Sequence, residues 1–345
     1  MTDTKTAPEV AGAAAITPVI SHWIEGRPVE VLPEQTGPVY DPASGQVIAR
    51  VPRGGADEVD RAVAVAAEAF PAWRDMPLIA RSHIFFNFRE LLYRNREEMA
   101  RLITQNHGKT FPDALAEVTR GLETVEFACG LPTQLAGMNT PNVSTGVDAF
   151  TLRQPLGVTA AITPFNFPAM VPMWIYPIAI AAGNTMVWKP SSHTWGAAQL
   201  QAELWTEAGL PDGVFNVVYG GREAVTAIVE HPDIKAIQFV GSTKVGTYVY
   251  QEGVKRGKRV GSYTSAKNAM LVLPDADMEQ TADAAVASGF GSAGERCMAQ
   301  TLVIAVGDAG AKLRPLMEER VGRLKIGPGM DEGVDMGPIY SAEHR

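Results

Sequence analysis

The residues with the clearest chemical potential surround Cys297, a thiol that directly follows the run Phe290-Gly-Ser-Ala-Gly-Glu-Arg296. The small residues of this run leave the thiol sterically open, and the guanidinium of Arg296 beside it favours thiolate over thiol. A thiolate attacks carbonyl carbons and later leaves readily from the thioester that forms. The pattern favours a catalytic nucleophile, with a structural thiol as the alternative.

Three further segments carry polar groups that could bind a ligand. Asn166 lies in Thr163-Pro-Phe-Asn-Phe-Pro168, where its amide could donate to an oxyanion or satisfy its own turn. Lys189 follows a short apolar run and could reach a ribose or phosphate, or remain a solvated surface lysine. Gly241-Ser-Thr-Lys-Val-Gly246 opens a predicted helix that could hold a pyrophosphate, although a plain tight turn fits equally well.

Other chemical motifs are incomplete. The segment His107-Gly-Lys-Thr110 is similar to the end of a phosphate-binding loop, but Ile103 stands where that loop requires its first glycine. The six histidines are scattered and form no His-x-x-x-His pair, and there is no Cys-x-x-Cys, so we predict no metal site. A serine-hydrolase elbow, Gly-x-Ser-x-Gly, is also missing from the sequence.

The loops that carry Asn166, Lys189 and Gly241 follow short apolar runs that alternate with helical segments. Strands are predicted at 158–162, 185–188, 214–218, 234–240, 269–273 and 301–306, and helices at 169–182, 195–208, 223–230 and from 278. This alternation predicts an α/β fold with a parallel sheet. Such a sheet binds ligands at the carboxyl ends of its strands, where these three residues lie.

Helical periodicity dominates the sequence before this region. Asp57 is expected to open one helix, and a second long helix carries an apolar face from Ile84 to Ile103. Gly108 is expected to end that helix, and a third helix begins near Thr110.

Composition limits the partners and the compartment. The 345 residues include 30 Lys and Arg against 38 Asp and Glu, a net charge of −8 that argues against nucleic acid and anionic membranes as partners. The two cysteines lie far apart in the sequence, which argues against a disulfide framework and fits a reducing cytoplasm. We predict neither a signal peptide nor a transmembrane segment.

Five short segments occur in a fixed order along the sequence. They are Thr163-Pro-Phe-Asn-Phe-Pro168, Trp188-Lys-Pro-Ser191, Ala208-Gly-Leu-Pro-Asp-Gly-Val-Phe-Asn216, Phe239-Val-Gly-Ser-Thr243 and Gly294-Glu-Arg-Cys297. From about residue 20 to its end, the sequence resembles the aldehyde dehydrogenase superfamily. Within it, the sequence is most similar to the CoA-acylating methylmalonate-semialdehyde dehydrogenases, on the strength of Val125–Gly130, Ala266–Asn268 and Ser292–Met298.

The resemblance implies a Rossmann-like parallel-sheet cofactor domain, a partial α/β catalytic domain and an oligomerising β-arm. Relatives continue well past Met336-Gly-Pro-Ile-Tyr340, so the sequence is short at its carboxyl end and the catalytic domain is expected to be incomplete. The expected division is a flexible leader at 1–20, a cofactor domain at 21–142 and 157–268, a partial oligomerisation arm at 143–156 and the catalytic domain at 269–345. A homo-oligomer is implied as well.

The resemblance also implies a mechanism. Cys297 would attack the aldehyde, Asn166 and the Cys297 backbone N–H would hold the oxyanion, and hydride would pass to NAD, leaving a thioester. Malonate or methylmalonate semialdehyde would then lose carbon dioxide and pass to coenzyme A, giving acetyl-CoA or propanoyl-CoA, as in valine catabolism. Arg120 and Arg296 match positions that grip the substrate carboxylate, a task suited to guanidinium. For Arg120, a helix-surface residue near Glu123 is the alternative.

Cofactor contacts carry over to three loops and to one residue beside the nicotinamide. They are Thr163, Phe165, Lys189, Ser192, His193, Ser242 and Thr264. Relatives usually place Glu where this sequence has Ser192, and losing that carboxylate relieves repulsion of a 2′-phosphate. NAD is therefore expected, with NADP as the alternative.

The sequence also differs from hydrolytic relatives at a position that affects which molecule accepts the acyl group. Hydrolytic relatives carry a water-activating Glu where this sequence has Tyr263. A thiol ionises more easily than water, so the change favours coenzyme A over water. Two alternatives stay open: a non-acylating aldehyde dehydrogenase, and a truncated, catalytically impaired paralogue that binds nucleotide or a full-length partner.

Overall fold

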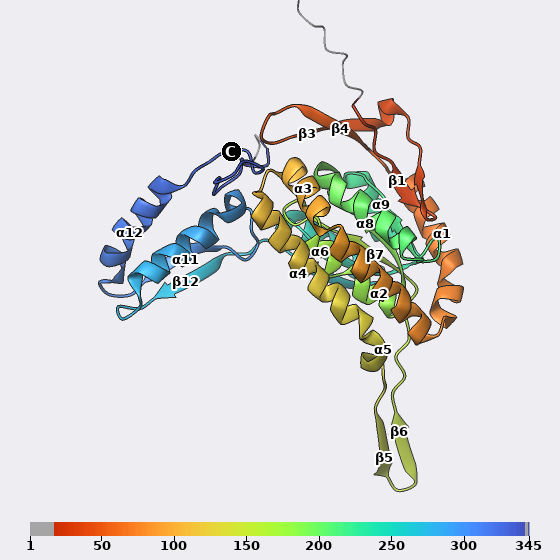
Figure 1. Ribbon diagram of the computed structural model, residues 1–345. Helices are drawn as coiled ribbons and strands as arrows, with labels where there is room; N and C mark the ends of the chain where they lie inside the picture. The colour runs from red at the N-terminus through yellow and green to blue at the C-terminus, as the bar shows by residue number, and fades with distance from the viewer. Residues whose placement is uncertain (1–16, 342–343, 345) are drawn as a thin grey trace, which may run out of the picture.

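A seven-stranded sheet forms the centre of the computed structural model, which describes residues 17–341 and 344 (Figure 1). Its strands are β1 (His22–Ile24), β2 (Arg27–Val29), β7 (Val158–Ile162), β8 (Thr185–Lys189), β9 (Phe215–Val217), β10 (Ile234–Val240) and β11 (Arg259–Tyr263). Their order is β11-β10-β7-β8-β9-β1-β2. The first five in this order run parallel, and β1 and β2 join antiparallel at one edge. The predicted parallel α/β sheet is thus confirmed. Residues 1–16 of the predicted leader lie outside the described residues.

Helices cover both faces of the sheet, because β7 and β8 are apolar throughout most of their length and buried at every position. Alternate side chains of a strand point to opposite faces. Ala160, Ile162 and Val187 therefore pack into one core with α1 (Ala56–Asp75), α9 (Arg222–Glu230) and α10 (Thr243–Lys255). Ala161, Met186 and Trp188 pack into a second core with α2 (Leu78–Arg94), α3 (Arg96–His107), α4 (Phe111–Cys129), α7 (Tyr176–Ala181) and α8 (Trp195–Glu207).

Two helices expected to be continuous are interrupted. The long helix predicted through Ile84 and Ile103 is in fact α2 followed by α3, because Asn95 leaves helical geometry and its amide donates to the carbonyl of Leu91. The helix predicted at 169–182 is likewise α6 (Met170–Met173) and α7, and Pro177, which has no N–H to donate, lies in the first turn of α7. As predicted, Gly108 ends α3 in the left-handed region, with φ of 94°.

A smaller layer follows the central sheet and carries the Cys297 segment. The parallel strands β12 (Asn268–Val272) and β13 (Gln300–Ala305) pack on α11 (Met278–Phe290) and α12 (Ala309–Arg323) around Val272, Ala282 and Leu313. In Figure 1 this layer lies to the left of the central sheet. The short helix η3 (Gly291–Gly294) connects α11 to the Cys297 segment.

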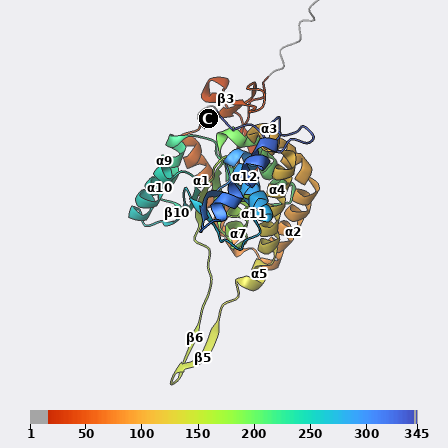
Figure 2. The same cartoon turned by 90° about the vertical axis from the view of Figure 1, so that its left-hand side faces the viewer.

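A hairpin projects from the body of the molecule in both views (Figures 1 and 2). It consists of β5 (Asn139–Ser144) and β6 (Val147–Phe150), and every residue in both strands is exposed. The arm predicted at 143–156 overlaps this hairpin, and its role in oligomerisation remains a prediction. The remaining elements are β3 (Thr36–Tyr40), β4 (Val47–Pro52), α5 (Leu131–Gln134), η1 (Pro33–Gln35) and η2 (Ser192–Thr194).

Two further observations concern the surroundings of the protein. Every helix within residues 17–341 is too short or too polar to cross a membrane. Both cysteines are free thiols, with Cys129 buried and Cys297 exposed. The two thiols therefore differ sharply in their access to solvent.

Candidate active site

A cleft of about 1160 Å³ opens at the carboxyl ends of the parallel strands, where the sequence predicted ligand binding. It extends from α10 across β10, β7 and β8 to the segment that carries Cys297. Predicted site residues from all of these elements line it. They are Thr163, Phe165, Asn166, Lys189, Ser192, His193, Ser242, Thr264, Arg296 and Cys297. Arg120 does not line this cleft.

Cys297 follows a sharp turn of the backbone. Ser292 and Ala293 both adopt left-handed geometry with φ of 53°, and Gly294 follows with φ of 79°. Left-handed geometry at a residue other than glycine costs about 1–3 kcal/mol and clusters at functional sites. Beyond the turn, the Asn268 amide donates to the carbonyls of Cys297 (2.8 Å) and Ala299 (3.0 Å). These bonds fix the backbone around an exposed thiol.

Asn166 contacts the Cys297 segment directly. Its Nδ2 donates to the carbonyl of Glu295 at 2.7 Å, across 129 positions of sequence. Its own carbonyl accepts from Lys109 Nζ at 2.6 Å. The amide group has two hydrogens, and this bond to Glu295 uses one of them. Asn166 is thus held at its side chain and at its backbone, and its side-chain partner precedes the nucleophile by two residues.

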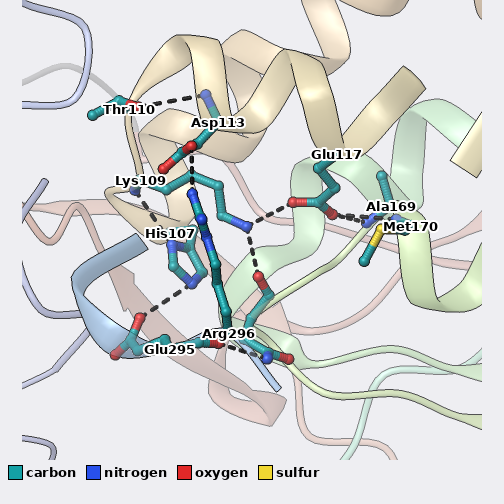
Figure 3. A network of polar contacts seen from close by, with 10 residues as sticks. His107, Lys109, Thr110, Asp113, Glu117, Ala169, Met170, Glu295 and Arg296 are labelled. Atoms are coloured by element: carbon teal, nitrogen blue, oxygen red, sulfur yellow. Dashed lines mark hydrogen bonds and ion pairs between the residues drawn. The ribbon is translucent and has the colours of Figure 1, made fainter. Parts of the chain in front are cut away.

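Lys109 belongs to a buried ion pair with Glu117 of α4, drawn in Figure 3. Lys109 Nζ lies 2.7 Å from Glu117 Oε2, and both side chains are fully buried. The other carboxylate oxygen of Glu117 accepts from the backbone N–H groups of Ala169 (2.8 Å) and Met170 (3.2 Å). The pair therefore binds the loop that carries Asn166.

Glu295 and His107 form a second buried contact. Glu295 Oε2 lies 3.2 Å from His107 Nε2, while His107 Nδ1 accepts from the backbone N–H of Lys109. Neutral His107 therefore carries its proton on Nε2, facing Glu295. Burial raises the pKa of Glu295 to about 7 and lowers the pKa of His107 well below its ordinary value. The uncharged forms of both groups are favoured because the protein removes water from them.

The two arginines lie in different environments. Arg296 Nη2 is 2.6 Å from Asp113 Oδ1 in the first turn of α4, and both side chains are partly buried. Arg120 lies on the surface of α4 with its side chain 69% exposed, 3.0 Å from Glu123. The geometry of Arg120 is that of the surface pair considered as its alternative. Its contact with a substrate carboxylate remains a prediction.

The other end of the cleft is formed by the loop after β8 and the start of α10. Lys189 is buried rather than solvated, and its Nζ donates to the carbonyls of Pro190 (2.9 Å) and Gly220 (3.0 Å). Burial lowers the pKa of Lys189 to about 8. Ser242 precedes α10, and a side chain at Gly246 would overlap Thr264, with only 2.4 Å between them. Glycine at 246 lets the helix start approach the end of β11.

Comparison with known proteins decides the family. Residues 31–345 match the model of the aldehyde dehydrogenase family. The chain belongs to this family. It is 47% identical over 329 residues to malonate-semialdehyde dehydrogenase 2 of Geobacillus thermodenitrificans, an alignment that covers 95% of this chain and 68% of that one. It is 44% identical over 326 residues to malonate-semialdehyde dehydrogenase of Halalkalibacterium halodurans, covering 94% of this chain and 67% of the relative.

Solved structures agree with this aldehyde dehydrogenase in fold. Methylmalonate-semialdehyde dehydrogenase from Oceanimonas doudoroffii superposes with a TM-score of 0.92 at 43% identity, covering 95% of this chain and 67% of that one. A putative methylmalonate-semialdehyde dehydrogenase from Sinorhizobium meliloti 1021, complexed with NAD, gives a TM-score of 0.92 at 40% identity with the same coverage. Membership of the family makes this protein an oxidoreductase.

Sequence reasoning about this aldehyde dehydrogenase missed the charged residues behind Asn166. In the sequence, Lys109 belongs only to an incomplete phosphate-loop motif, and no motif predicts a role for Glu117, Asp113 or Glu295. The one local signal was Glu117 itself, a charge on the apolar face that Ala114 and Val118 share with it in α4. A charge on a buried helix face predicts a partner, since buried charges are almost always paired.

Proposed function

We propose that this aldehyde dehydrogenase oxidises malonate or methylmalonate semialdehyde with NAD through a thioester on Cys297. Loss of carbon dioxide and transfer to coenzyme A would give acetyl-CoA or propanoyl-CoA. The observation that carries the proposal is the bond between the Asn166 amide and the carbonyl of Glu295, two residues before an exposed Cys297 in one cleft. The names of the relatives support the choice of substrate.

In this mechanism the Cys297 sulfur forms a bond to the aldehyde carbon, and the carbonyl π electrons move to oxygen. The second hydrogen of the Asn166 amide and the Cys297 backbone N–H would donate to that oxyanion. Removing one such donor typically costs about 10²–10³ in rate. The carbon then loses hydride, the C=O bond reforms, and the acyl group remains on sulfur.

NAD would supply the hydride acceptor when bound, and the cleft has features that fit it. The backbone N–H groups at the start of α10 suit a pyrophosphate, because a helix start favours anions. Buried Lys189 and neighbouring Ser192 would hold the adenosine ribose. Thr264 would lie beside the nicotinamide, at the end of β11.

The substrate carboxylate would meet Arg296, next to the nucleophile, with Arg120 proposed as a second contact. Arg296 has five N–H donors and uses one short bond on Asp113, so others remain for the substrate. A malonyl thioester loses carbon dioxide with its electrons delocalised into the thioester carbonyl. The carbon that lost carbon dioxide would then take up a proton from solvent, which gives the acetyl thioester. Coenzyme A would attack the thioester carbonyl as its thiolate, and Cys297 would leave as a thiolate.

NADP is a second candidate cofactor, favoured by the charges around Ser192. A side pocket of about 490 Å³ shares Ser192, His193 and Arg222 with the main cleft and is also lined by Arg53 and Glu223. Arginines suit a phosphate, and Ser192 brings no charge that would repel one. A 2′-phosphate would therefore fit beside Ser192.

We further propose that residues 21–142 and 157–268 form the cofactor domain and that 269–345 contribute to the catalytic domain. The hairpin of β5 and β6 is proposed to mediate a homo-oligomer, since its exposed side chains include Val143, Val147 and Phe150. Sedimentation of the intact protein, with and without the hairpin tip shortened, tests this assembly.

NADH formation from malonate semialdehyde, measured with and without coenzyme A, tests the activity. Without coenzyme A, NADH formation should stop after the first equivalent per active site, and with coenzyme A it should continue. Mass spectrometry should show acetyl-CoA as the product. Turnover that ignores coenzyme A would favour a non-acylating dehydrogenase. NAD binding in a thermal shift assay without any NADH formation would favour the impaired, nucleotide-binding alternative.

A further inference from the structure

The Lys109–Glu117 pair has no part in the chemistry just described, yet both charges are deeply buried. Lys109 is 1% exposed and Glu117 is 2% exposed. Removing an ion from water costs several kcal/mol even after the protein relaxes. Attraction between the two charges offsets this cost only where further hydrogen bonds satisfy the remaining donors and acceptors. The positions of those further bonds therefore indicate what the pair does.

All of the further bonds go to one loop. Lys109 Nζ donates to the carbonyl of Asn166 (2.6 Å) and lies 4.2 Å from the ring centroid of Phe167, a cation–π contact. Glu117 accepts from the N–H groups of Ala169 and Met170. Figure 3 shows the pair between α4 and this loop. The two charges thus fix the loop at its centre and at its end.

We propose that Lys109 and Glu117 are positioning residues that act through Asn166 by clamping the 163–170 loop. This proposal rests on the proposed function, because the clamp is proposed to position Asn166 as the oxyanion donor. The side-chain amide of Asn166 donates to the backbone carbonyl of Glu295. Lys109 donates to the backbone carbonyl of Asn166 itself. Loss of the clamp leaves the amide attached on one side only, and its second hydrogen no longer has a fixed direction.

A purely structural ion pair would stabilise the fold without this effect, and variants separate the two roles. Lys109→Met removes the clamp but leaves Glu117 as an uncompensated buried charge. The double variant Lys109→Met with Glu117→Gln removes both charges, so it keeps the experiment possible if the single variant does not fold. Lys258→Met is the matched control. Lys258 is also buried, donates to the carbonyls of His231 and Ile234, and does not line the cleft.

The measurement is the single-turnover rate of NADH formation with saturating semialdehyde. We expect Lys109→Met and the double variant to lower it by about 10- to 100-fold, below the 10²–10³ typical of losing an oxyanion donor outright. KM should change by less than about threefold, and Lys258→Met should leave the rate within about twofold. In an Asn166→Ala background, the double variant should lower the rate by less than about twofold, because the group it positions is gone.

Multiplicative rate losses from the double variant and Asn166→Ala would overturn the proposal, since independent effects add in free energy. A rate unchanged in the double variant would overturn it too. Hydrogen–deuterium exchange of the peptide around 163–173 needs no substrate and separates this test from the proposed function. If the wild-type protein forms no NADH, faster exchange there in the double variant but not in Lys258→Met supports the clamp, and unchanged exchange refutes it.

Discussion

Replacing Glu295 with Gln should change how stability depends on pH. The raised pKa of about 7, against an ordinary value of 4.5, means that the folded protein holds this proton more tightly than the unfolded protein does. The stabilisation that the protonated Glu295 contributes is fully present below pH 4.5, the pKa in the unfolded state. It is lost as the pH rises from 4.5 through the folded-state pKa of about 7. Glutamine stays neutral and keeps the shape of the protonated acid, so Glu295→Gln should not show this loss.

The magnitude follows from the shift in pKa. One unit corresponds to about 1.4 kcal/mol, so the whole shift is worth about 3 kcal/mol, of which about 2 to 3 kcal/mol falls between pH 5 and pH 8. For a protein of 345 residues, this corresponds to about 3 to 4 °C in Tm. The Tm of the wild-type protein, measured against that of Glu295→Gln by differential scanning fluorimetry, should fall by this amount between the two pH values.

His107 also titrates differently in the folded protein, but its lowered pKa reduces stability on the acid side in both proteins. Taking the difference between wild type and Glu295→Gln cancels this contribution. Parallel curves of Tm against pH for the two proteins would refute the reasoning, because they would show that Glu295 titrates at its ordinary pKa in the folded state.

Two further substitutions and one labelling experiment have expected outcomes. Cys297→Ser should abolish NADH formation while keeping the thermal shift caused by NAD, and residual turnover would exclude Cys297 as the nucleophile. Ser192→Glu should lower kcat/KM with NADP by at least about tenfold relative to kcat/KM with NAD, because a carboxylate close to the 2′-phosphate costs over about 1 kcal/mol in repulsion. An unchanged ratio of kcat/KM with NADP to kcat/KM with NAD would contradict the proposed phosphate site. In native protein at pH 8, a maleimide should label Cys297 alone, since Cys129 is buried and burial raises its pKa to about 11; peptide mapping by mass spectrometry checks this.

The sequence allowed the centre of the sheet to be predicted well. Strand β7 begins and ends where its apolar run does, because a strand buried between two helix layers needs apolar residues on both faces. Strand β10 also has the predicted bounds, although Lys235 and Gln238 within it are exposed. The edge strand β11 was not predicted. Its residues Arg259 to Tyr263 are mostly half-buried and include a glycine and two polar side chains, so no apolar run marks them.

The site was also only partly predictable from the sequence. Residues on loops after central strands, such as Asn166 and Lys189, could be located because strand ends meet along one edge. The contact between Lys109 and the Asn166 loop could not, since it joins residues 57 positions apart through the docking of α4 on the sheet. Local sequence shows that Glu117 is unusual in an apolar helix face, but it does not show which side chain lies opposite.

The left-handed turn at Ser292 and Ala293 also has a consequence for protein engineering. Glycine adopts this geometry without the steric cost borne by a side chain, so Ser292→Gly and Ala293→Gly mark two positions where a glycine substitution, usually destabilising, is expected to cost little or to raise stability. β-Branched residues at either position would be strongly disfavoured. The segment before the nucleophile thus accepts a narrow set of side chains, and a directed-evolution library should restrict these two codons to small residues.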